Sequence, residues 1–434
     1  MLSELIFFFY RKEVQYTITF FIIFILLLVL WIRWKHRFWL TQPVFHNYNL
    51  YYWILPPGII NEKLPRPNNY FDPLHGFTEF NRLQSYEIDN ALDLVKGHYL
   101  QDARIKYNPT RRALKGYFEG HSYPCYFSFA YVTNPIIDYR NKQVLNKRKP
   151  ISLMTSRPLE LKCHGKETEL RVYYVDFLCT HKAHRKKGIT QRTIYSHYIN
   201  YRRQDPENMI ALFKREGEQS VFVPMVRFLS YGFHLKRWTV PPPFHPSSSV
   251  VPISRKNIHL LQDFVSKNCG HFSTVIKPEF SHIASLIKTD NVYCYILVIY
   301  GNIHCAYFFR NSFTYYSEYA KAEDVSDVKL LDKMSHQGNS IELFASIHRK
   351  IPDDNGIICD LKQFVDGFYH SVHQILLKKE FQFRVLVIEN ISNNNRILKN
   401  VIRKYRPIFK VENGYYYYNF AVHPELPKDV LVIN

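Results

Sequence analysis

The sequence predicts an α/β protein with two consecutive lobes, each built on a mixed β-sheet, preceded by one N-terminal transmembrane helix. The chain has 434 residues, enough for two medium-sized hydrophobic cores. A segment rich in proline and serine, residues 241–250, divides it into halves of similar size, and each half contains strand–helix–strand patterns. We therefore expect a membrane anchor over residues 1–35, a first lobe over 36–240 and a second lobe over 241–434.

The anchor is predicted from an uncharged apolar run, Tyr16–Ile32. At about 1.5 Å per helical residue, this run is just long enough to cross the hydrocarbon core of a bilayer. Positive charge is in slight excess on its distal side, in Arg33, Lys35 and Arg37. We therefore expect a single-pass membrane protein whose folded part faces the cytoplasm. Glycosylation of the Asn390 sequon would indicate the reverse orientation. The alternative for the same run is a helix buried in the core.

The composition limits the expected partners. The net charge is +20 and the pI about 9.4, but Lys and Arg are spread along the chain, so no nucleic-acid partner is expected. A basic surface also suits an anionic membrane face or a polyphosphate cofactor. The seven cysteines form an odd set without CxxC spacing, which indicates neither a disulfide framework nor a zinc ribbon. His181 and His184 are expected on the surface of a basic loop, and no metal and no permanently bound cofactor is expected.

Apolar runs and turn residues define the elements of the first half. A connection rich in proline and asparagine follows the anchor over Leu50–Pro73. Ile194, Tyr198 and Tyr201 lie at helical spacing and indicate one buried helix face. The predicted elements are a helix over Ile88–Leu100, strands over Phe127–Thr133, Ile151–Met154, Leu159–Cys163 and Leu170–Thr180, and a helix over Ile189–Arg203. A basic loop, Arg140–Lys149, separates the first two strands, and His164-Gly165 is the turn between the last two.

The second half is predicted to begin with a helix capped by Ser254. Within residues 293–310 two apolar strands flank Gly301-Asn302, which indicates a hairpin. The chain stays apolar up to Asn434, which is typical of a buried tail or of a packed terminal strand. The other predicted elements are a helix carrying Phe364, Phe368, Val372 and Ile375 on one face, a strand over Phe383–Glu389, a short helix over Leu398–Tyr405 and a strand over Tyr415–Ala421.

The most informative segment is Tyr174–Thr190, which reads YVDFLCTHKAHRKKGIT. It contains an apolar strand, a Cys-Thr-His turn, a basic cluster and one glycine that opens a helix. Backbone amides and cations at a helix start are suited to hold phosphates. Amides left unpaired at a strand end can polarise a carbonyl group. This combination is typical of an acyl-CoA transferase.

Two blocks of the sequence resemble the signature segments of N-myristoyltransferases, the glycylpeptide N-tetradecanoyltransferases. Arg37–Val44 reads RFWLTQPV, like the family's KFW-TQPV block, and DFLC at 176–179 followed by His181-Lys182 is similar to its NFLC-HKK-R-K block. Looser similarity in Val385–Ser392 and Gly414–Phe420 extends toward the end of the chain. The resemblance implies two tandem GNAT-like acyltransferase lobes with a pseudo-twofold relation. It also implies transfer of myristate, or a similar fatty acyl chain, from acyl-CoA to the N-terminal glycine of protein substrates.

The resemblance assigns roles to individual residues. The backbone amides of Phe177 and Leu178 would form the oxyanion hole, the α-carboxylate of Asn434 would be the general base, and Tyr107 would contact the peptide. A weak base suffices, because an α-amino group has a pKa near 8 and about a tenth of it is already unprotonated at pH 7. The acyl-CoA site would consist of Arg37, Phe38, Trp39, Phe177, Leu178, Cys179, Arg185, Lys186, Lys187, Gly188, Ile189 and Thr190.

The chain departs from the family pattern in the peptide groove. The acidic loop of the family is reduced to Tyr99–Asp102, and a threonine and a histidine of the groove are replaced near Lys214 and Ser230. Two alternatives therefore stay open. One is a non-catalytic acyl-CoA-binding relative of the same fold, which the changed groove favours, and the other is a GNAT-type enzyme that acylates a small amine.

Overall fold

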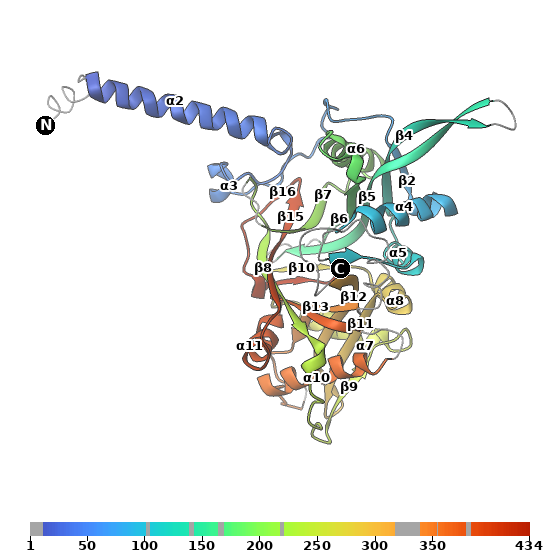
Figure 1. The fold of residues 1–434 in the computed structure, drawn as a ribbon. Helices are drawn as coiled ribbons and strands as arrows, with labels where there is room; N and C mark the ends of the chain where they lie inside the picture. The colour runs from blue at the N-terminus through green and yellow to red at the C-terminus, as the bar shows by residue number, and fades with distance from the viewer. Residues whose placement is uncertain are drawn as a thin grey trace.

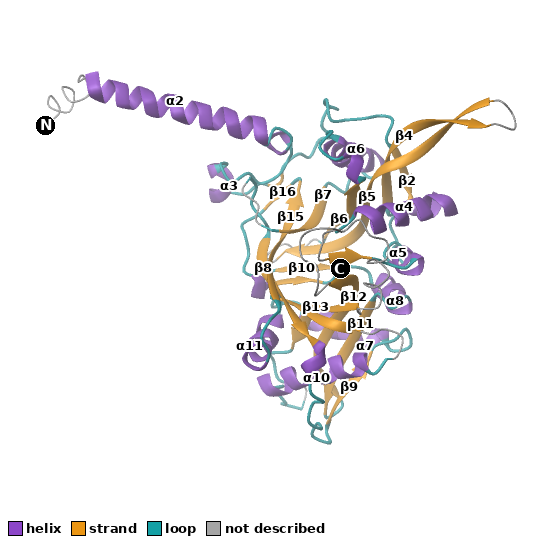
Figure 2. Ribbon diagram, viewed as in Figure 1, coloured by secondary structure: helices purple, strands orange, loops and turns teal. Residues whose placement is uncertain are grey.

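A computed structural model describes residues 12–100, 105–138, 143–163, 169–217, 221–316, 339–353, 355–378 and 383–434. A long helix, α2, projects from a folded body, and helices surround a sheet that extends through the whole body (Figure 1, Figure 2). The C-terminus lies in the middle of the body, among the strands (Figure 1).

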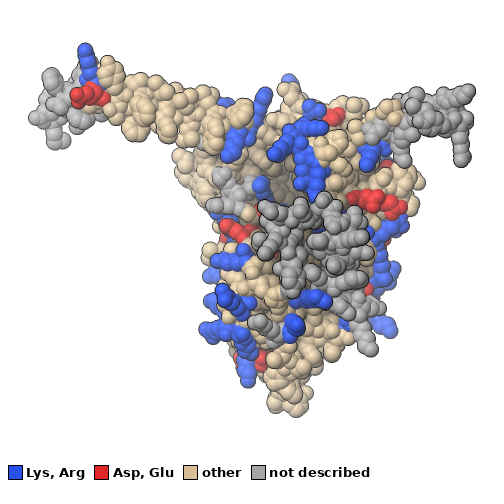
Figure 3. All heavy atoms as spheres, viewed as in Figure 1, with Lys and Arg blue, Asp and Glu red and all other residues tan. Residues whose placement is uncertain are grey.

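Helix α2 spans Lys12–Lys35 and confirms the helix predicted for the apolar run. It is long and apolar enough to cross a membrane, and none of its apolar stretch is buried. Phe20 is 66% exposed and Leu30 61% exposed, so the alternative of a helix buried in the core is wrong. The length of α2 is free of charge between its two ends (Figure 3).

In the described part of the chain, one mixed sheet of 15 strands forms the body, and a separate pair is formed by β1 (Gly58–Ile59) and β16 (Phe420–Ala421). The main path of the large sheet has the order β17-β10-β5-β6-β7-β15-β8-β14-β13-β12-β11-β9. Its strands in the first half are β2 (Gly76–Glu79), β3 (Ile105–Tyr107), β4 (Tyr126–Asp138), β5 (Gln143–Cys163), β6 (Leu170–Thr180), β7 (Ile210–Glu216) and β8 (Val226–His234). Those in the second half are β9 (Ser248–Pro252), β10 (Thr274–Lys277), β11 (Val292–Ile299), β12 (Asn302–Tyr316), β13 (Asn339–His348), β14 (Phe383–Glu389), β15 (Phe409–Tyr418) and β17 (Val430–Val432).

The two halves share this sheet, so the prediction of one separate sheet per half is wrong. Strand β15 of the second half lies between β7 and β8 of the first half, and β8 in turn pairs with β14. The physical reason is that each of these strands would otherwise leave an edge unpaired, and the other half supplies the missing hydrogen-bond partner.

The strand order mirrors itself about the β15·β8 pair. On one side α6 (Ile189–Gln204) connects the parallel strands β6 and β7, and on the other α10 (Leu361–Leu376) connects the parallel strands β13 and β14. The halves also exchange short strands, because β10 pairs with β5 while β3 pairs with β12.

Helices cover the sheet and bury their apolar faces on it. Phe364, Phe368 and Val372 of α10 are at most 2% exposed, as the helical spacing predicted. The remaining helices are α3 (Leu50–Ile54), α4 (Ser85–His98), α5 (Arg111–Gly116), α7 (Ile258–Asn268), α8 (Phe280–Lys288) and α11 (Asn394–Lys404). Short 3₁₀ turns lie at Trp39–Thr41, Phe80–Arg82, Lys182–His184, Leu235–Arg237 and Pro427–Asp429.

Several predicted elements differ from the structure in detail. The two strands predicted over 151–154 and 159–163 are one long strand, β5, which also takes up most of the predicted basic loop. The cap of α7 is Asn257, and the amide and hydroxyl of Ser254 both donate to the Asn257 side chain. The hairpin turn is Tyr300-Gly301, one residue earlier than predicted, with both residues at positive φ. The predicted His164-Gly165 turn and residues 139–142 lie outside the described residues.

Candidate active site

A cavity of about 1040 Å³ lies where the two halves meet. Its walls come from β6, β7 and α6 of the first half and from β12, β13 and β15 of the second. This volume is at the upper end of the range for small-molecule sites. Both resemblance blocks reach it, through Phe38 and Trp39 and through Asp176, Phe177 and Leu178.

A β-bulge in β6 frees one of the two predicted oxyanion amides from the sheet. The register places Leu178 opposite Met154 but Val175 opposite Ser156, so two residues of β6 face the single Thr155 of β5. Such a bulge removes backbone groups from the ladder. The Phe177 N–H accordingly donates to the Thr155 side-chain oxygen, 3.1 Å away.

The second predicted amide, that of Leu178, faces away from β5. Because the His181 N–H donates to the Ile151 carbonyl oxygen at 2.8 Å, the alternation of antiparallel pairs turns the amide three residues earlier to the opposite edge of β6. Parallel pairing of β6 with β7 ends there, at Val175 opposite Phe213. The Leu178 amide therefore lies where β6 and β7 have separated, and Leu178 lines the cavity.

The start of α6 presents backbone donors and one lysine to the same cavity. Lys186 has φ of 63° and Gly188, at the N-cap, has φ of 75°. A Cβ at Gly188 would meet no atom within 4 Å, so the space in front of the helix is open. Lys186, Gly188, Ile189 and Thr190 all line the cavity. The unpaired N–H groups of a first helical turn favour an anionic group at this place.

Four residues predicted for the acyl-CoA site do not line the cavity. Arg185 instead ties two chain segments together, with donors to the carbonyl oxygens of Thr180 (3.2 Å) and His98 (2.8 Å). Cys179 is buried in the core, and burial raises the pKa of its thiol to about 12. Arg37 and Lys187 are exposed to solvent.

Aromatic rings form the wall next to the root of α2. Phe38 is 6% exposed and packs edge-on against Trp39 at 5.1 Å between ring centroids. Trp39 stacks on Phe213 (6.3 Å) and contacts Phe222 (4.9 Å). The wall is therefore apolar and close-packed, as a site for a hydrocarbon chain requires.

The predicted peptide contact, Tyr107, lines the cavity and is 6% exposed. Its ring lies 5.4 Å from that of Tyr99 and 6.0 Å from that of Phe177. Tyr107 therefore lies next to the bulge in β6, and its role as a peptide contact stays a prediction.

The C-terminal tail is buried. Strand β17 pairs with β10, and Asn434 is 2% exposed. The Asn434 side-chain oxygen accepts a hydrogen bond of 3.2 Å from Arg310, which lines the cavity. Asn434 itself does not line it. The predicted general base therefore lies behind the cavity wall rather than on it.

A buried group of charges, absent from the sequence predictions, contributes Lys214, Arg310 and Glu342 to the cavity wall. Lys214 is ion-paired with Glu389 and with Glu342 (3.5 Å), and Arg310 with Glu342 (2.8 Å) and Glu389 (3.2 Å). Burial raises the pKa of Glu389, whereas the pKa of Glu342 is lowered, since burial is outweighed by Arg310 and Lys214 together. The sequence did not predict this group, because its four residues lie far apart in the chain, on β7, β12, β13 and β14.

Asp176 is the carboxylate on the cavity wall beside the predicted oxyanion amides. Its side chain is 7% exposed, and both oxygens accept from the Arg157 Nε atom, at 3.1 and 2.9 Å. Burial raises its pKa to about 6, although Arg157 opposes this shift. A carboxylate with this pKa is ionised at neutral pH and can accept a proton.

A hydrogen-bonded chain links α6 to the sheet. The hydroxyls of Ser128 and Ser156 lie 2.8 Å from Nδ1 and Nε2 of His197. Burial lowers the pKa of His197 to about 3. Because this imidazole stays neutral, it is a poor base for a serine nucleophile, and its two bonds fix α6 on β4 and β5.

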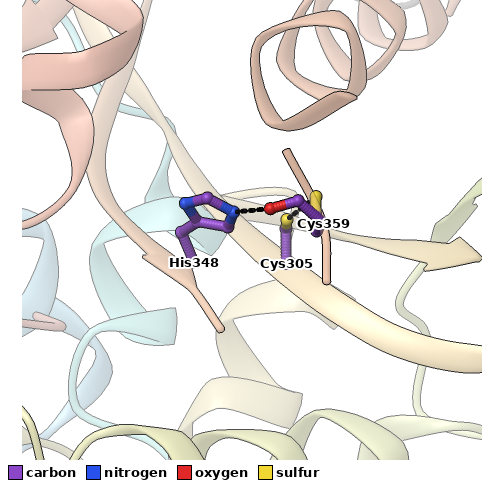
Figure 4. Close-up of side chains that lie close together, drawn as sticks. All are labelled: Cys305, His348 and Cys359. Atoms are coloured by element: carbon purple, nitrogen blue, oxygen red, sulfur yellow. Dashed lines mark hydrogen bonds between the residues drawn. The ribbon is translucent and has the colours of Figure 1, made fainter. Parts of the chain in front are cut away.

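Cys305, His348 and Cys359 lie together in the second half, buried at the start of α10 (Figure 4). The two sulfur atoms are 3.5 Å apart. Both ring nitrogens of His348 are engaged, because Nδ1 lies 2.8 Å from a nitrogen of Arg396 and Nε2 lies 3.0 Å from the Cys359 carbonyl oxygen. A guanidinium that donates to Nδ1 places the proton on Nε2, so this tautomer has no lone pair left for a metal.

The comparisons with known proteins identify the fold. No protein-family profile and no curated protein sequence matches the chain. A crystal structure of Saccharomyces cerevisiae N-myristoyltransferase with bound myristoyl-CoA is similar at a TM-score of 0.62 and 14% identity, over 92% of this chain and 99% of the yeast chain. A second structure of that enzyme with bound myristoyl-CoA gives 0.66 and 13%, over 92% and 94%. A third, with myristoyl-CoA and inhibitors, gives 0.62 and 13%, over 90% and 91%. At these identities the likeness shows the fold, and it confirms the resemblance seen in the two sequence blocks.

Proposed function

We propose that the chain transfers a myristoyl or similar fatty acyl group from acyl-CoA to the N-terminal glycine amine of protein substrates. The observation that carries the proposal is the bulge in β6 and the end of its pairing with β7, which leave the Leu178 amide at a cavity with an anion-binding helix start on one side and an aromatic wall on the other. The likeness to the fold of yeast N-myristoyltransferase supports it.

The mirrored strand order supports two GNAT-like lobes related by a pseudo-twofold axis near the β15·β8 pair. In this reading the first lobe holds acyl-CoA and the second lobe contributes the peptide side. Myristoyl-CoA or another acyl-CoA is then a co-substrate, and no permanently bound cofactor takes part.

The residues present suit this direct transfer. The phosphates of CoA would lie before the α6 start and Lys186, and the hydrocarbon chain along Phe38 and Trp39. Burying about 13 methylene or methyl groups would yield roughly 10 kcal/mol of gross affinity. The amine attacks the thioester carbon, so that a C–N bond forms and the C–S bond breaks. The Leu178 amide would hold the oxyanion, a donor worth about 3 kcal/mol in the transition state. The Phe177 amide, predicted as the second donor, donates to Thr155 and would have to give up that bond to contribute.

Two carboxylates are candidates to take the proton that the amine releases. The α-carboxylate of Asn434 was predicted, but Asn434 does not line the cavity. Asp176 lines the cavity next to Phe177 and occupies the position of the asparagine in the family block. We therefore assign Asp176 as the group that accepts the proton released by the amine. A glycine amine would be selected because any Cβ next to it would crowd the bulge.

The proposal is tested by incubating the full chain, in detergent or nanodiscs, with labelled myristoyl-CoA and peptides that begin with Gly or Ala. Transfer to Gly peptides but not to Ala peptides supports it. Acylation of small amines, with no peptide product, would support the GNAT-type alternative instead.

The second candidate function is acyl-CoA binding without catalysis. It is favoured by the changed peptide groove, because Lys214 and Ser230 line the cavity near the places where the resemblance would put a threonine and a histidine. CoA binding with no transfer to any amine would support this candidate.

We further propose that α2 anchors the chain as a single-pass membrane protein with the body in the cytoplasm, where acyl-CoA is found. The Asn390 sequon is a poor reporter of orientation, because its side-chain oxygen is buried and Ile391 and Ser392 are each 1% exposed. Protease protection of the body in sealed vesicles is the better test.

A further inference from the structure

The segment that follows α2 carries an apolar surface that the described residues leave exposed. Residues 38–61 contain no Lys, Arg, Asp or Glu. Within them, α3 and its flanks expose large side chains, with Leu50 at 73% and Ile54 at 80%. The others are Tyr48 (61%), Tyr51 (62%), Trp53 (42%) and Leu55 (61%). Soluble proteins rarely leave so many neighbouring apolar side chains in water.

This surface is held firmly, so its exposure is a property of the fold. The Val223 N–H donates to the Phe45 carbonyl oxygen at 2.7 Å. The inner residue of α3, Tyr52, packs against Phe45 with 5.7 Å between ring centroids. The Trp53 carbonyl oxygen lies 3.0 Å from the His423 ring.

The surface lies at the root of α2. Burial raises the pKa of the Tyr48 hydroxyl, and the charge of Arg33 opposes this shift. Tyr48 therefore lies close to Arg33, which is in the last turn of α2. Helix α3 lies on the side of the body from which α2 projects (Figure 1), and the surface there is tan in Figure 3.

We propose that Tyr48–Leu55 lies in the interface of the bilayer that α2 crosses and holds the body against it. Tyr and Trp are the residues enriched at the membrane–water boundary, and Leu and Ile can reach the acyl region below it. The proposal rests on the membrane anchor and not on acyl transfer. It brings the aromatic wall close to the lipid, because Phe38 lies only three residues after the end of α2.

The test places the full chain in phosphatidylcholine nanodiscs that contain a diazirine-bearing phosphatidylcholine, and maps photo-adducts by mass spectrometry. Adducts are expected on α2 and on Tyr48–Leu55. The variant Leu50→Asp/Ile54→Asp, in which both changed side chains are exposed, should lose the second set and keep the first. Leu361 at the start of α10 and Leu377 just after its end, 53% and 65% exposed, are the α10 control and should stay unlabelled.

Each other outcome overturns the proposal. Adducts on α2 alone, or labelling of Tyr48–Leu55 no stronger than that of the α10 control, would mean that the surface serves a protein partner or stays in water. If neither α2 nor Tyr48–Leu55 carries adducts, the proposal that α2 anchors the chain in the bilayer is also wrong. None of these results depends on acyl transfer, so a failure here is distinguishable from a failure of the proposed function.

Discussion

Replacing Asp176 by Asn is expected to remove the proton acceptor while preserving the shape of the cavity wall. Asparagine is isosteric, and its amide oxygen can still accept from Arg157. General-base catalysis contributes typically about 10²- to 10⁴-fold, so we expect kcat to fall by about 100-fold or more. The acyl-CoA dissociation constant should change little, because Asp176 is assigned neither to the CoA phosphates nor to the hydrocarbon chain.

The structure indicates that this loss would not come from unfolding. Burial raises the pKa of Asp176 from its ordinary 3.8 to about 6, so keeping it ionised in the folded state at pH 7 costs about 3 kcal/mol. Because the pKa of Asp176 is higher in the folded state than in the unfolded state, its contribution to stability is fully present below pH 4 and is lost as the pH rises through 6. Asparagine avoids the cost, but it leaves the buried Arg157 charge without its partner, which costs about 3–5 kcal/mol. The two effects nearly cancel, and we expect the variant to lose no more than about 2 kcal/mol.

The assay is the pH profile of peptide acylation at saturating myristoyl-CoA, with thermal unfolding as the control for folding. Activity of the unaltered chain should fall as pH drops through about 6, because Asp176 then binds a proton, and this limb should disappear in Asp176→Asn. Deletion of Asn434 is the matched comparison and should change kcat far less. The reasoning fails if Asp176→Asn keeps kcat within about threefold, or if deleting Asn434 alone abolishes turnover and leaves CoA affinity unchanged.

Two further predictions use pairs of matched variants. Lys186→Gln should weaken CoA binding about fivefold at low salt in a calorimetric titration, while Lys187→Gln, which does not line the cavity, should weaken it less; equal effects would contradict the assigned cradle. Gly367→Ala should lower the free energy of unfolding by about 2–3 kcal/mol in denaturant titrations, because the added Cβ meets the Tyr307 hydroxyl. Gly97→Ala in α4 has open space around the added Cβ and should raise the free energy of unfolding by about 0.5–1 kcal/mol. If both glycine variants change the free energy of unfolding in the same direction, this explanation from packing is wrong.

Local patterns were enough to predict the elements that surround the site. Strand β6 and strand β14 have the predicted bounds, and α6 begins at the predicted residue, because each apolar run ends at turn residues or at a glycine. The proposed phosphate-binding helix start and the proposed oxyanion amides followed from these elements and from the two resemblance blocks.

The other features of the fold and the site depend on contacts between residues far apart in the chain, which a local sequence pattern does not reveal. Strand β8 was missed because its sequence, VRFLSYGFH, contains a glycine and polar residues, which suit it only because it is paired on both edges by strands of the second half. Gly232 is needed there, since a Cβ would meet the ring of Phe409. The role of Asp176 likewise depends on the bulge opposite Thr155, and a register shift leaves no mark in a single sequence.

The shared sheet makes the cavity a property of both halves together. The first half provides the bulge and the start of α6, but β7 then has a free edge, which β15 of the second half occupies. Glu342 of β13 pairs with Lys214 of β7 and with Arg310 of β12, so the second half supplies a carboxylate partner for the lysine of the first half. Without the second half, that lysine would stand buried beside an unpaired strand. The acyl-CoA side and the amine side of the proposed reaction therefore have to fold as one unit, and a fragment ending at residue 240 should form neither the cavity nor a stable sheet.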